Sequence, residues 1–324
     1  MKKLTKQIAA LSAVVLGFAS FNTAIYNICT KPCRPDRSEG MQAKSIELDR
    51  FLPFDNNSEI INVKSDFQLT NNLPVIDSAA ALYPVSSAFV NAVYPENSVN
   101  FKGNDFTTDS KLQMRNTIAA YKAVVDGNSD IIICAKPSEE QLKYAADNNV
   151  ELELIPIGCE AFVFLVNGSN PVDNLITDEI KGIYSGKYTN WSQLGGKNTP
   201  INPVTRNAGS GSQTALESFM GDTPIKKNPV GFVGSAIGFS FRYYVEDIAE
   251  HGNIKILSLN GVYPNKVNIA NGNYPIVSNF YAVYSKSNDN PNIQPFIDWM
   301  LSDEGQDIID KTGYIPLTSA SLIN

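Results

Sequence analysis

The residues with the most distinctive chemistry lie near position 210, where an arginine precedes a cluster of small residues: Arg206, Ser210, Gly211 and Ser212. An apolar run, 201–204, precedes this segment and an amphipathic run, 215–220, follows it. The order predicts a strand, a glycine-containing turn and a helix that begins at the serines. The first turn of a helix has unpaired backbone N–H groups at the positive end of the helix dipole, and a guanidinium can bind an oxyanion through two parallel hydrogen bonds. The segment therefore predicts an anion site, with a capped helix beside a surface arginine as the alternative.

Two further turns have a similar character. The small residues 78–81 connect an apolar strand to a helix, and another such turn precedes Thr117. In open α/β sheets, ligands bind beyond the carboxyl ends of the strands, where turns of this kind converge. Three helix starts aimed at one cleft would form a strong anion site, because each presents unpaired N–H groups.

Short strands and helices alternate along the chain. Apolar spacing predicts helices over 80–93 and 116–125 and a buried strand over 131–134, and a further helix is capped at Ser138. Strands are also expected over 150–155 and 161–166, and a helix from Thr177. This alternation predicts an α/β fold with mainly parallel sheets. At 324 residues the chain can form two lobes or one large domain.

Composition narrows the classes of partner. A hydrophobic content of 43% with 18% charged residues is typical of a globular protein. The net charge of −7 argues against nucleic acid, because binding to its phosphate backbone requires a basic surface. The acidity does not exclude a small anion, since a local cluster of donors decides such binding and overall charge mainly alters the approach rate.

The N-terminus is predicted to be an export signal. Lys2, Lys3 and Lys6 form a basic start, and the apolar run 8–21 that follows is short for a membrane span. An uncleaved anchor that extends to Ile28 and a lipid-modified Cys29 are alternatives. In each case the bulk of the chain is expected outside the cytoplasm, at the outer face of the cell membrane or in the periplasm.

The cysteines and the single histidine indicate little chemistry. Cys134 and Cys159 adjoin apolar runs and are predicted to be buried, and a disulfide between them stays open. No cysteine pair lies at ligand spacing from histidines, so neither a metal site nor a cofactor is expected. His251, in a polar turn, is expected at the surface. One histidine and no nucleophile–base pair argue against an enzyme.

Several motifs carry a resemblance to a known family. The segments 170–175 and 183–191, the latter ending in Asn190-Trp191, resemble the second-lobe signature of ABC-transporter phosphate-binding proteins. The Arg206-x-x-x-Ser210-Gly211-Ser212 element is similar to that family's anion loop, and 311–316 to its C-terminal ending. The resemblance spans roughly 73–317. It implies a two-lobed, periplasmic-binding-protein-like (type II) fold with a hinge of two crossing strands, and a dehydrated phosphate held between the lobes without chemistry.

The resemblance also implies which residues bind the ligand. The second lobe would contribute side chains and backbone of the anion loop, and the first lobe would contribute backbone N–H groups near a proline together with a hydroxyl. These residues are Arg206, Ser210, Gly211 and Ser212 from the second lobe, and Ala81, Leu82, Tyr83, Asn116 and Thr117 from the first. We expect the side chain of Tyr83, like the Asn190-Trp191 pair, to be structural.

The sequence departs from the family at three places. Ala79 and Ala80 replace a hydroxyl-rich turn, Cys134 and Ala135 stand where the family has an anion-facing serine and carboxylate, and the interval 220–238 is short, so a supporting helix is expected to be missing. Phosphate near neutral pH carries a proton that sulfate lacks, and a carboxylate in a dehydrated cleft accepts it. The alanine at 135 therefore predicts poor discrimination against sulfate unless another acidic residue enters the cleft.

The expected organisation is a signal peptide or membrane anchor over 1–28, a tether and lead-in over 29–72, and a two-lobed domain over 73–324. Its first lobe would cover about 73–156 and 280–324, and its second about 157–279. The expected function is that of an exported, monomeric solute-binding protein that captures phosphate or a related oxyanion for an ABC permease. A non-transporting sensor or partner-binding surface protein is the alternative, motivated by the lost donors and the shortened second lobe.

Overall fold

The computed structural model describes residues 46–226, 235–248 and 253–317. All of them lie in one compact unit of the chain, residues 41–324. The export signal, Cys29 and His251, for which the sequence carried expectations, lie outside the described residues. Within the described ranges, no helix combines the length and the apolar character that crossing a membrane requires.

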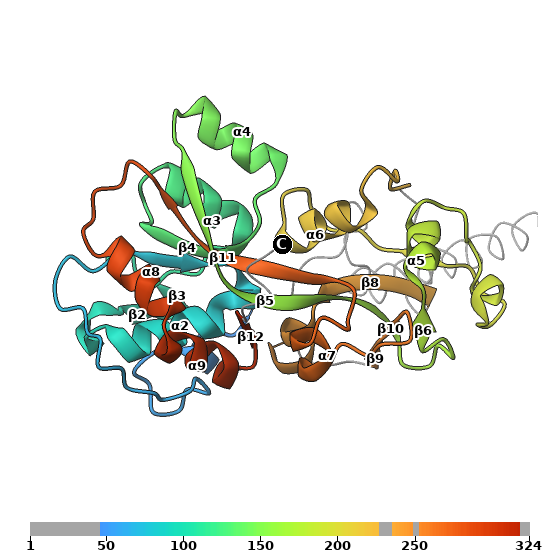
Figure 1. The fold of residues 1–324 in the computed structure, drawn as a ribbon, viewed down its shortest axis with the longest axis horizontal. Helices are drawn as coiled ribbons and strands as arrows, with labels where there is room; N and C mark the ends of the chain where they lie inside the picture. Colours follow the sequence, from blue (N-terminus) through green and yellow to red (C-terminus); the bar gives the residue numbers. More distant parts are fainter. Residues whose placement is uncertain (1–45, 227–234, 249–252, 318–324) are drawn as a thin grey trace, which may run out of the picture. The chain divides into compact units, whose positions relative to one another are not determined.

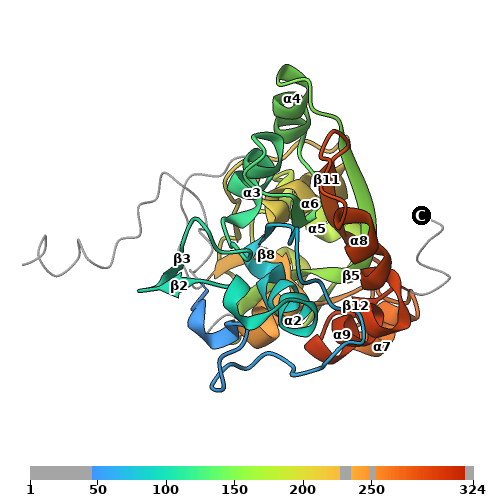
Figure 2. The ribbon, with the colours of Figure 1, turned by 90° about the vertical axis from the view of Figure 1, so that its left-hand side faces the viewer.

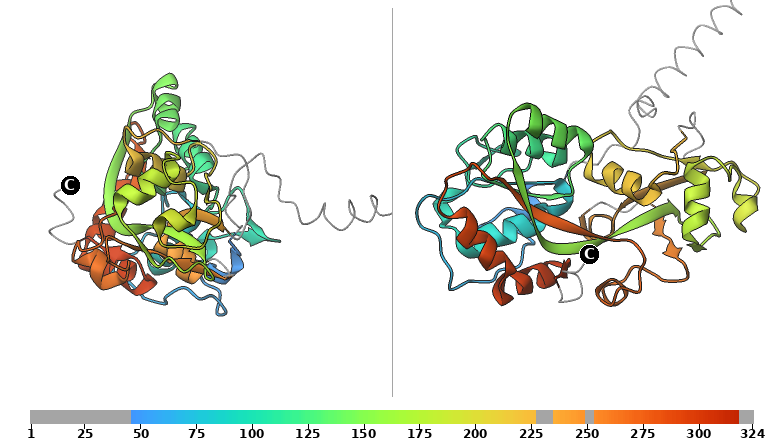
Figure 3. Two further views of the ribbon diagram at one scale, coloured as in Figure 1. Left: turned by 90° about the vertical axis from the view of Figure 1, so that its right-hand side faces the viewer. Right: turned by 45° about the horizontal axis from the view of Figure 1, so that its top comes forward.

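One sheet runs through the described unit, in the order β1-β4-β11-β5-β8-β7 (Figure 1). Its longest strand is β5 (Leu152–Asn167), which pairs with β11 (Val277–Ser285) along its first half and with β8 (Ala236–Phe241) along its second. The two long strands therefore extend from the first lobe into the second, as the right-hand view of Figure 3 shows. They are the connection between two separate hydrophobic cores.

The prediction of mainly parallel sheets is wrong. Among the described strands, β1 with β4, β7 with β8 and a short pair outside this sheet are parallel, besides one isolated bridge between Ile76 and Leu112. The pairs β4–β11, β11–β5 and β5–β8 are all antiparallel. The reason is that β5 and β11 cross between the lobes in opposite directions, and strands 150–155 and 161–166 are one continuous strand rather than two.

The first lobe has a core of apolar side chains from both ends of the unit. The helices α2, α8 and α9 pack together on one side of it (Figure 2), and Phe89, Phe296 and Trp299 meet between them. The elements of this lobe are η1 (Asp49–Phe51), β1 (Ile76–Ser78), η2 (Ala80–Leu82), α2 (Tyr83–Val93), η3 (Glu96–Ser98), β2 (Phe101–Lys102), β3 (Asp105–Phe106), α3 (Asn116–Val125), β4 (Ile131–Ala135), α4 (Glu139–Asp147), α8 (Ile293–Leu301) and α9 (Asp303–Thr312).

The segment expected to be a tether and lead-in belongs in part to this core. Ile46, Leu48, Phe51 and Leu69 are buried in it, and the carbonyl of Leu48 accepts a hydrogen bond from the buried hydroxyl of Tyr83. The expected boundary at residue 73 is therefore too late, because the folded body includes residues from 46 onward. This segment is anchored by only a few apolar residues, and they are not spaced periodically. Its sequence pattern therefore did not reveal the packing.

The second lobe has its own core around β5 and β8. Trp191 is buried there and its indole N–H donates to the carbonyl of Ser235 at 3.0 Å, which confirms a packing role for the Asn190-Trp191 pair. The elements are β6 (Asn174–Leu175), α5 (Thr177–Tyr184), η4 (Trp191–Leu194), β7 (Asn202–Pro203), α6 (Gly211–Met220), β8, β9 (Ile254–Ile256), β10 (Ser258–Leu259), α7 (Lys266–Ala270) and β12 (Ile315–Pro316). The π-helix η6 (Tyr244–Ile248) contributes to both cores.

The sequence left two questions open, the state of Cys134 and Cys159 and the consequence of the short interval 220–238. Cys134 and Cys159 are both buried and both free, so no disulfide joins them. Burial raises the pKa of the Cys159 thiol to about 11, which keeps it protonated near neutral pH. Between α6 and β8, residues 221–226 and 235 form no α-helix, whereas the rest of the interval is outside the described residues, so the expected loss of a supporting helix stays a prediction.

Candidate functional site

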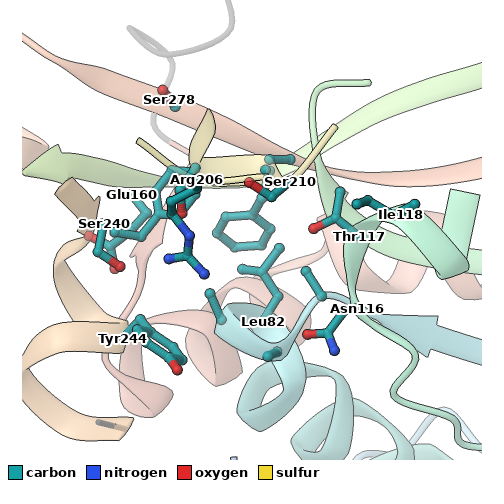
Figure 4. Close-up of a pocket in the computed structure, with 18 of the residues that line it drawn as sticks. Leu82, Asn116, Thr117, Ile118, Glu160, Arg206, Ser210, Ser240, Tyr244 and Ser278 are labelled. Atoms are coloured by element: carbon teal, nitrogen blue, oxygen red, sulfur yellow. The ribbon is translucent and has the colours of Figure 1, made fainter. Parts of the chain in front are cut away.

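A cavity of about 450 Å³ lies between the lobes, and the starts of three helices line it: η2 with α2, α3 and α6. Each start follows the turn that leaves a strand or an extended segment, as the sequence predicted. Figure 4 shows Ser210 and Thr117 near each other and the guanidinium of Arg206 to one side of both. The convergence that sequence alone left untested is therefore present.

The second-lobe wall is the start of α6. The hydroxyl oxygen of Ser210 caps the helix by accepting from the N–H of Gln213 at 3.3 Å, so its own hydrogen is left to donate. Gly209 has a φ of +75°, which an L side chain rarely adopts. Within the described chain, the N–H groups of Gly211 and Ser212 have no acceptor. Three donors thus gather at one helix end.

Arg206 is the cation of this wall. Its backbone N–H donates to the side-chain oxygen of Gln213 at 2.9 Å, which fixes the residue against the first turn of α6. The guanidinium forms no hydrogen bond or ion pair with any described residue. Burial lowers the pKa of Arg206 below its ordinary value, because the charge is taken out of water without a partner. A bound anion would offset that desolvation.

The first-lobe wall begins at the η2 turn, and here the expectation for Leu82 and Tyr83 is corrected. The N–H of Leu82 donates to the carbonyl of Ala79 at 2.9 Å, and that of Tyr83 donates to Ala80 within the tight turn. Tyr83 does not line the cavity and is fully buried. The N–H groups of Ala80 and Ala81 are the ones without an acceptor among the described residues. The 3-10 turn, which small-residue composition did not reveal, therefore leaves Ala81 of the expected donors and adds Ala80.

The turn is held by a distant residue. The hydroxyl of Tyr314, on the segment that leads into β12, donates to the carbonyl of Ala81 at 2.7 Å. Tyr314 is itself fully buried. Because this contact fixes the peptide that follows Ala81, it orients the turn at the edge of the cavity.

The start of α3 supplies the other first-lobe donors. Thr117 is buried, and its hydroxyl has no hydrogen-bond partner within the described chain. Asn116 also lines the cavity, but with a φ of +66° it serves as the left-handed residue that starts the helix. Figure 4 shows its amide pointing away from Arg206. The hydroxyl of Thr117 is therefore the better donor of the two.

A second arginine lines the cavity without being available. One Arg115 side-chain nitrogen lies 2.6 Å from the carboxylate of Asp77, which is completely buried and also accepts the backbone N–H of Arg115 at 2.9 Å. This pairing neutralises Arg115 and fixes the turn before α3. Asp77 lies in β1, and its pairing with Arg115 was not foreseen because 38 residues separate the two.

The two walls touch at one end of the cleft. The side-chain N–H of Gln141, in α4, donates to the carbonyl of Gly209 at 2.9 Å across the lobes. A methyl group on Gly211 would lie 3.3 Å from the hydroxyl oxygen of Thr117 and 3.4 Å from the Cβ of Ala135. Gln141 also closes the capping box with Ser138. The sequence marked Ser138 as a cap but gave no sign that its partner reaches the other lobe.

The floor of the cleft is the place where β5 leaves β11 and joins β8. Glu160 of β5 lines it and is paired with Arg242, with a distance of 3.2 Å from Oε1 to Nε. Arg242 also contacts Glu246 and donates to the carbonyl of Gly313 at 2.7 Å. Burial raises the pKa of Glu160 to about 7, against the opposing effect of Arg242. Glu160 is the acidic residue whose entry into the cleft the sequence left open.

Ala135 lines the cavity beside Gly211, where the resemblance placed the family's carboxylate. Among the described lining residues, Glu160 is the one carboxylate, and its oxygens already accept from the N–H of Ala161 and from Arg242. The end of the cleft that is lined by Arg206 and the three helix starts, the anion end, therefore offers hydrogen-bond donors rather than a free carboxylate.

The fold and this arrangement of helix starts define a two-lobed binding protein, and comparison with known proteins gives the family. The chain belongs to the PBP superfamily, because the model of the PBP superfamily domain matches residues 81–304, more than half of the chain. The resemblance drawn from the motifs is confirmed.

Individual relatives agree with this assignment. The phosphate-binding protein PstS of Bacillus subtilis (strain 168) is 30% identical over 210 residues, which are 60% of this chain and 65% of PstS, just under two thirds of its length. A solved structure from Clostridium perfringens, assigned as a phosphate ABC transporter substrate-binding protein and containing bound phosphate, matches with 26% identity and a TM-score of 0.58 over 75% of this chain and 99% of that one. An ABC-type phosphate transport receptor from Vibrio cholerae, at 21% identity and a TM-score of 0.52 over 77% and 100%, shows the shared fold.

Proposed function

We propose that this protein is an exported solute-binding protein that captures phosphate, or a related tetrahedral oxyanion, for an ABC permease. One observation carries the proposal: the guanidinium of Arg206 and the N–H groups at the starts of η2 and α6, all without a partner among the described residues, face one cavity between two lobes together with the hydroxyl of Thr117. Such donors suit a dehydrated oxyanion, because each hydrogen bond to a charged group is stronger out of water. The names of the relatives support the same ligand class.

The proposed ligand set differs from the expected one in the first lobe. Arg206, Ser210, Gly211 and Ser212 would bind from the second lobe, and Thr117 from the first. Ala81 is kept and Ala80 is added, because their N–H groups are the ones without acceptors in the described structure. Leu82 and Tyr83 are left out because their N–H groups are paired, and Asn116 because Thr117 is the better donor. Binding would proceed without bond making or breaking, since the cavity contains no nucleophile with an adjacent base among the described residues.

The remaining expectations become part of the proposal. The protein would act outside the cytoplasm as a monomer, with the loaded, closed form recognised by the permease. The two lobes would close about the hinge strands, and this closure would bring the first-lobe donors into contact with an anion already bound to the second lobe.

Calorimetry on the protein purified in phosphate-free buffer tests the proposal. Titration with inorganic phosphate should give saturable binding with one site per chain. A protein that retains its thermal unfolding transition but gives no heat with phosphate, sulfate or a phosphate ester would instead favour the sensor or partner-binding alternative.

A further inference from the structure

The cavity is larger than inorganic phosphate requires, although the lobes already touch at one end. Gln141 bonds to Gly209 across the lobes, and α6 lies against Thr117 and Ala135. Even if each of the five non-hydrogen atoms of phosphate took the share of a water molecule, about 30 Å³, the ion would occupy only about a third of the space. The cavity volume of about 450 Å³ is that of a pocket for a small organic molecule.

The anion end offers donors but no free carboxylate. Inorganic phosphate near neutral pH has three ionised or double-bonded oxygens and a fourth oxygen that carries a proton, which needs an acceptor. Ala135 supplies none, and the carboxylate of Glu160 is occupied by Arg242 and a backbone N–H. In the dianion of a phosphate monoester, the fourth oxygen carries carbon instead of a proton, so it needs room rather than an acceptor. The second ionisation of such an ester has a pKa of about 6, so the dianion dominates at pH 7.

The floor of the cleft has the chemistry of a site for a small hydroxylated group. Ser278 and Asn279 of β11 and Ser240 of β8 line it, next to the rings of Phe241 and Phe280. Ser240 is buried, and its hydroxyl has no hydrogen-bond partner among the described residues. Figure 4 shows Ser240 on the side of Arg206 opposite to Thr117. Hydroxyl and amide groups beside aromatic rings can bind both the O–H and the C–H surfaces of a short polyol.

We propose that the preferred ligand is a phosphate monoester with a small polyol substituent. Its three terminal oxygens bind to Arg206 and the three helix starts, and its ester oxygen points toward the hinge floor. The substituent lies against Phe241 and Phe280 and bonds to Ser240 and Asn279. This inference rests on the proposed function, because it uses the same anion end of the cleft.

Titration of the full chain, purified in phosphate-free buffer at pH 7.5, tests the inference with four probes: glycerol 3-phosphate, inorganic phosphate, sulfate and glycerol. We expect glycerol 3-phosphate to bind at least about tenfold more tightly than inorganic phosphate, since two added hydrogen bonds and one apolar contact have that scale. Glycerol alone should not bind, because it lacks the phosphoryl group that meets Arg206.

Two variants of the floor sharpen the test. Ser240→Leu fills space on the floor and removes the hydroxyl, and should reduce the ratio of the glycerol 3-phosphate affinity to the phosphate affinity by about tenfold. Ser240→Ala removes the hydroxyl but leaves the space, and should reduce that ratio by a few-fold. Thermal unfolding and the phosphate titration of each variant show whether it is folded and whether its anion end is intact.

The outcomes separate the two proposals. If inorganic phosphate binds and glycerol 3-phosphate binds equally or more weakly, the monoester inference is wrong and the proposed function stands. If none of the anions binds to folded protein, both fail. If the ester is preferred but both Ser240 variants keep the full preference, the substituent does not lie on the hinge floor and the placement is wrong.

Discussion

The two walls of the cleft present an anion with different chemistry. The second-lobe wall has the hydroxyls of Ser210 and Ser212 and an arginine, Arg206, that has no partner among the described residues. The first-lobe wall also has an arginine, Arg115, but the buried carboxylate of Asp77 neutralises it. That wall contributes backbone N–H groups and the hydroxyl of one threonine. Both walls are built from helix starts, yet only the second-lobe wall presents a positive charge to the ligand.

This difference indicates a division of labour. Since the charge lies in the second lobe, an anion should bind there first, and most of the affinity should depend on that wall. The first lobe closes over the bound anion with uncharged donors, so changes in it should alter closure and selectivity more than affinity.

Replacement of Arg206 should have the largest effect. In Arg206→Lys a compact ammonium cannot form two parallel hydrogen bonds, and we expect anion binding to weaken by roughly 1–3 kcal/mol, or about 5- to 150-fold. Arg206→Ala should be at least as damaging. Arg50→Lys is the matched control, because Arg50 is paired with Glu59 and does not line the cavity. Calorimetric affinities for phosphate equal to the parent in both Arg206 variants would refute the site.

The hinge that joins the walls should make stability depend on pH. The folded protein raises the pKa of Glu160 to about 7 from an ordinary value of 4.5. Between these values the folded state binds a proton that the unfolded state has released, so stability should fall as pH rises from about 4.5 to about 7 and level off above. The slope cannot exceed about 1.4 kcal/mol per pH unit, and the pKa shift corresponds to a total of about 3 kcal/mol over this window.

Thermal unfolding at a series of pH values measures this slope. Glu160→Gln should flatten it, since the amide does not titrate. Glu153→Gln, on the same strand but with a side chain 36% exposed, is the control and should leave the slope unchanged. A slope of the same size in Glu160→Gln would show that another group titrates in this window.

The contact between the walls should affect release of the ligand. Gln141→Glu keeps a side-chain oxygen that accepts from the backbone N–H of Ser138. It removes the side-chain N–H that donates to the carbonyl of Gly209. We expect a loss of about 1 kcal/mol in affinity, mainly as a faster dissociation rate, because the contact forms on closure. Glu140→Gln, at the exposed neighbouring position, should change nothing. Stopped-flow release that is the same in Gln141→Glu and the parent would mean that the hydrogen bond does not stabilise the closed state.

The sequence predicted the parts of the site that are local. The turn from Arg206 to Ser212 and the helix start at Thr117 follow from a few consecutive residues, and the structure brings them to one cavity. Burial of Trp191 and Tyr83 also followed from local pattern. These features were predictable because the sequence pattern of a strand, a turn or a helix is contained within about ten consecutive residues.

The parts that depend on distant partners were not predictable in this way. Pairing of Leu152 with Ser285 makes the hinge antiparallel, and it joins residues more than a hundred positions apart. Neutralisation of Arg115 by Asp77 and the contact from Gln141 to Gly209 likewise connect separate segments. The donor at Ala80 was missed, and Leu82 and Tyr83 were wrongly included, for a local reason: the 3-10 turn pairs the N–H groups of Leu82 and Tyr83.

The smallest effect expected here is on selectivity, and it tests the first-lobe wall. Because Ala135 lies beside Gly211 and the one carboxylate of the described lining is engaged by Arg242, the parent should discriminate poorly between phosphate and sulfate. Ala135→Asp adds an acceptor that a protonated phosphate satisfies and sulfate does not. The ratio of phosphate to sulfate affinity should rise by about three- to tenfold, and Ala135→Asn, of similar size but uncharged, should raise it less.

The same carboxylate should lower the preference for glycerol 3-phosphate, whose ester oxygen has no proton to donate. Competition of bound phosphate by sulfate measures the ratio. A parent protein that already excludes sulfate by a large factor would show that Glu160, despite its pairing, accepts the proton of the ligand.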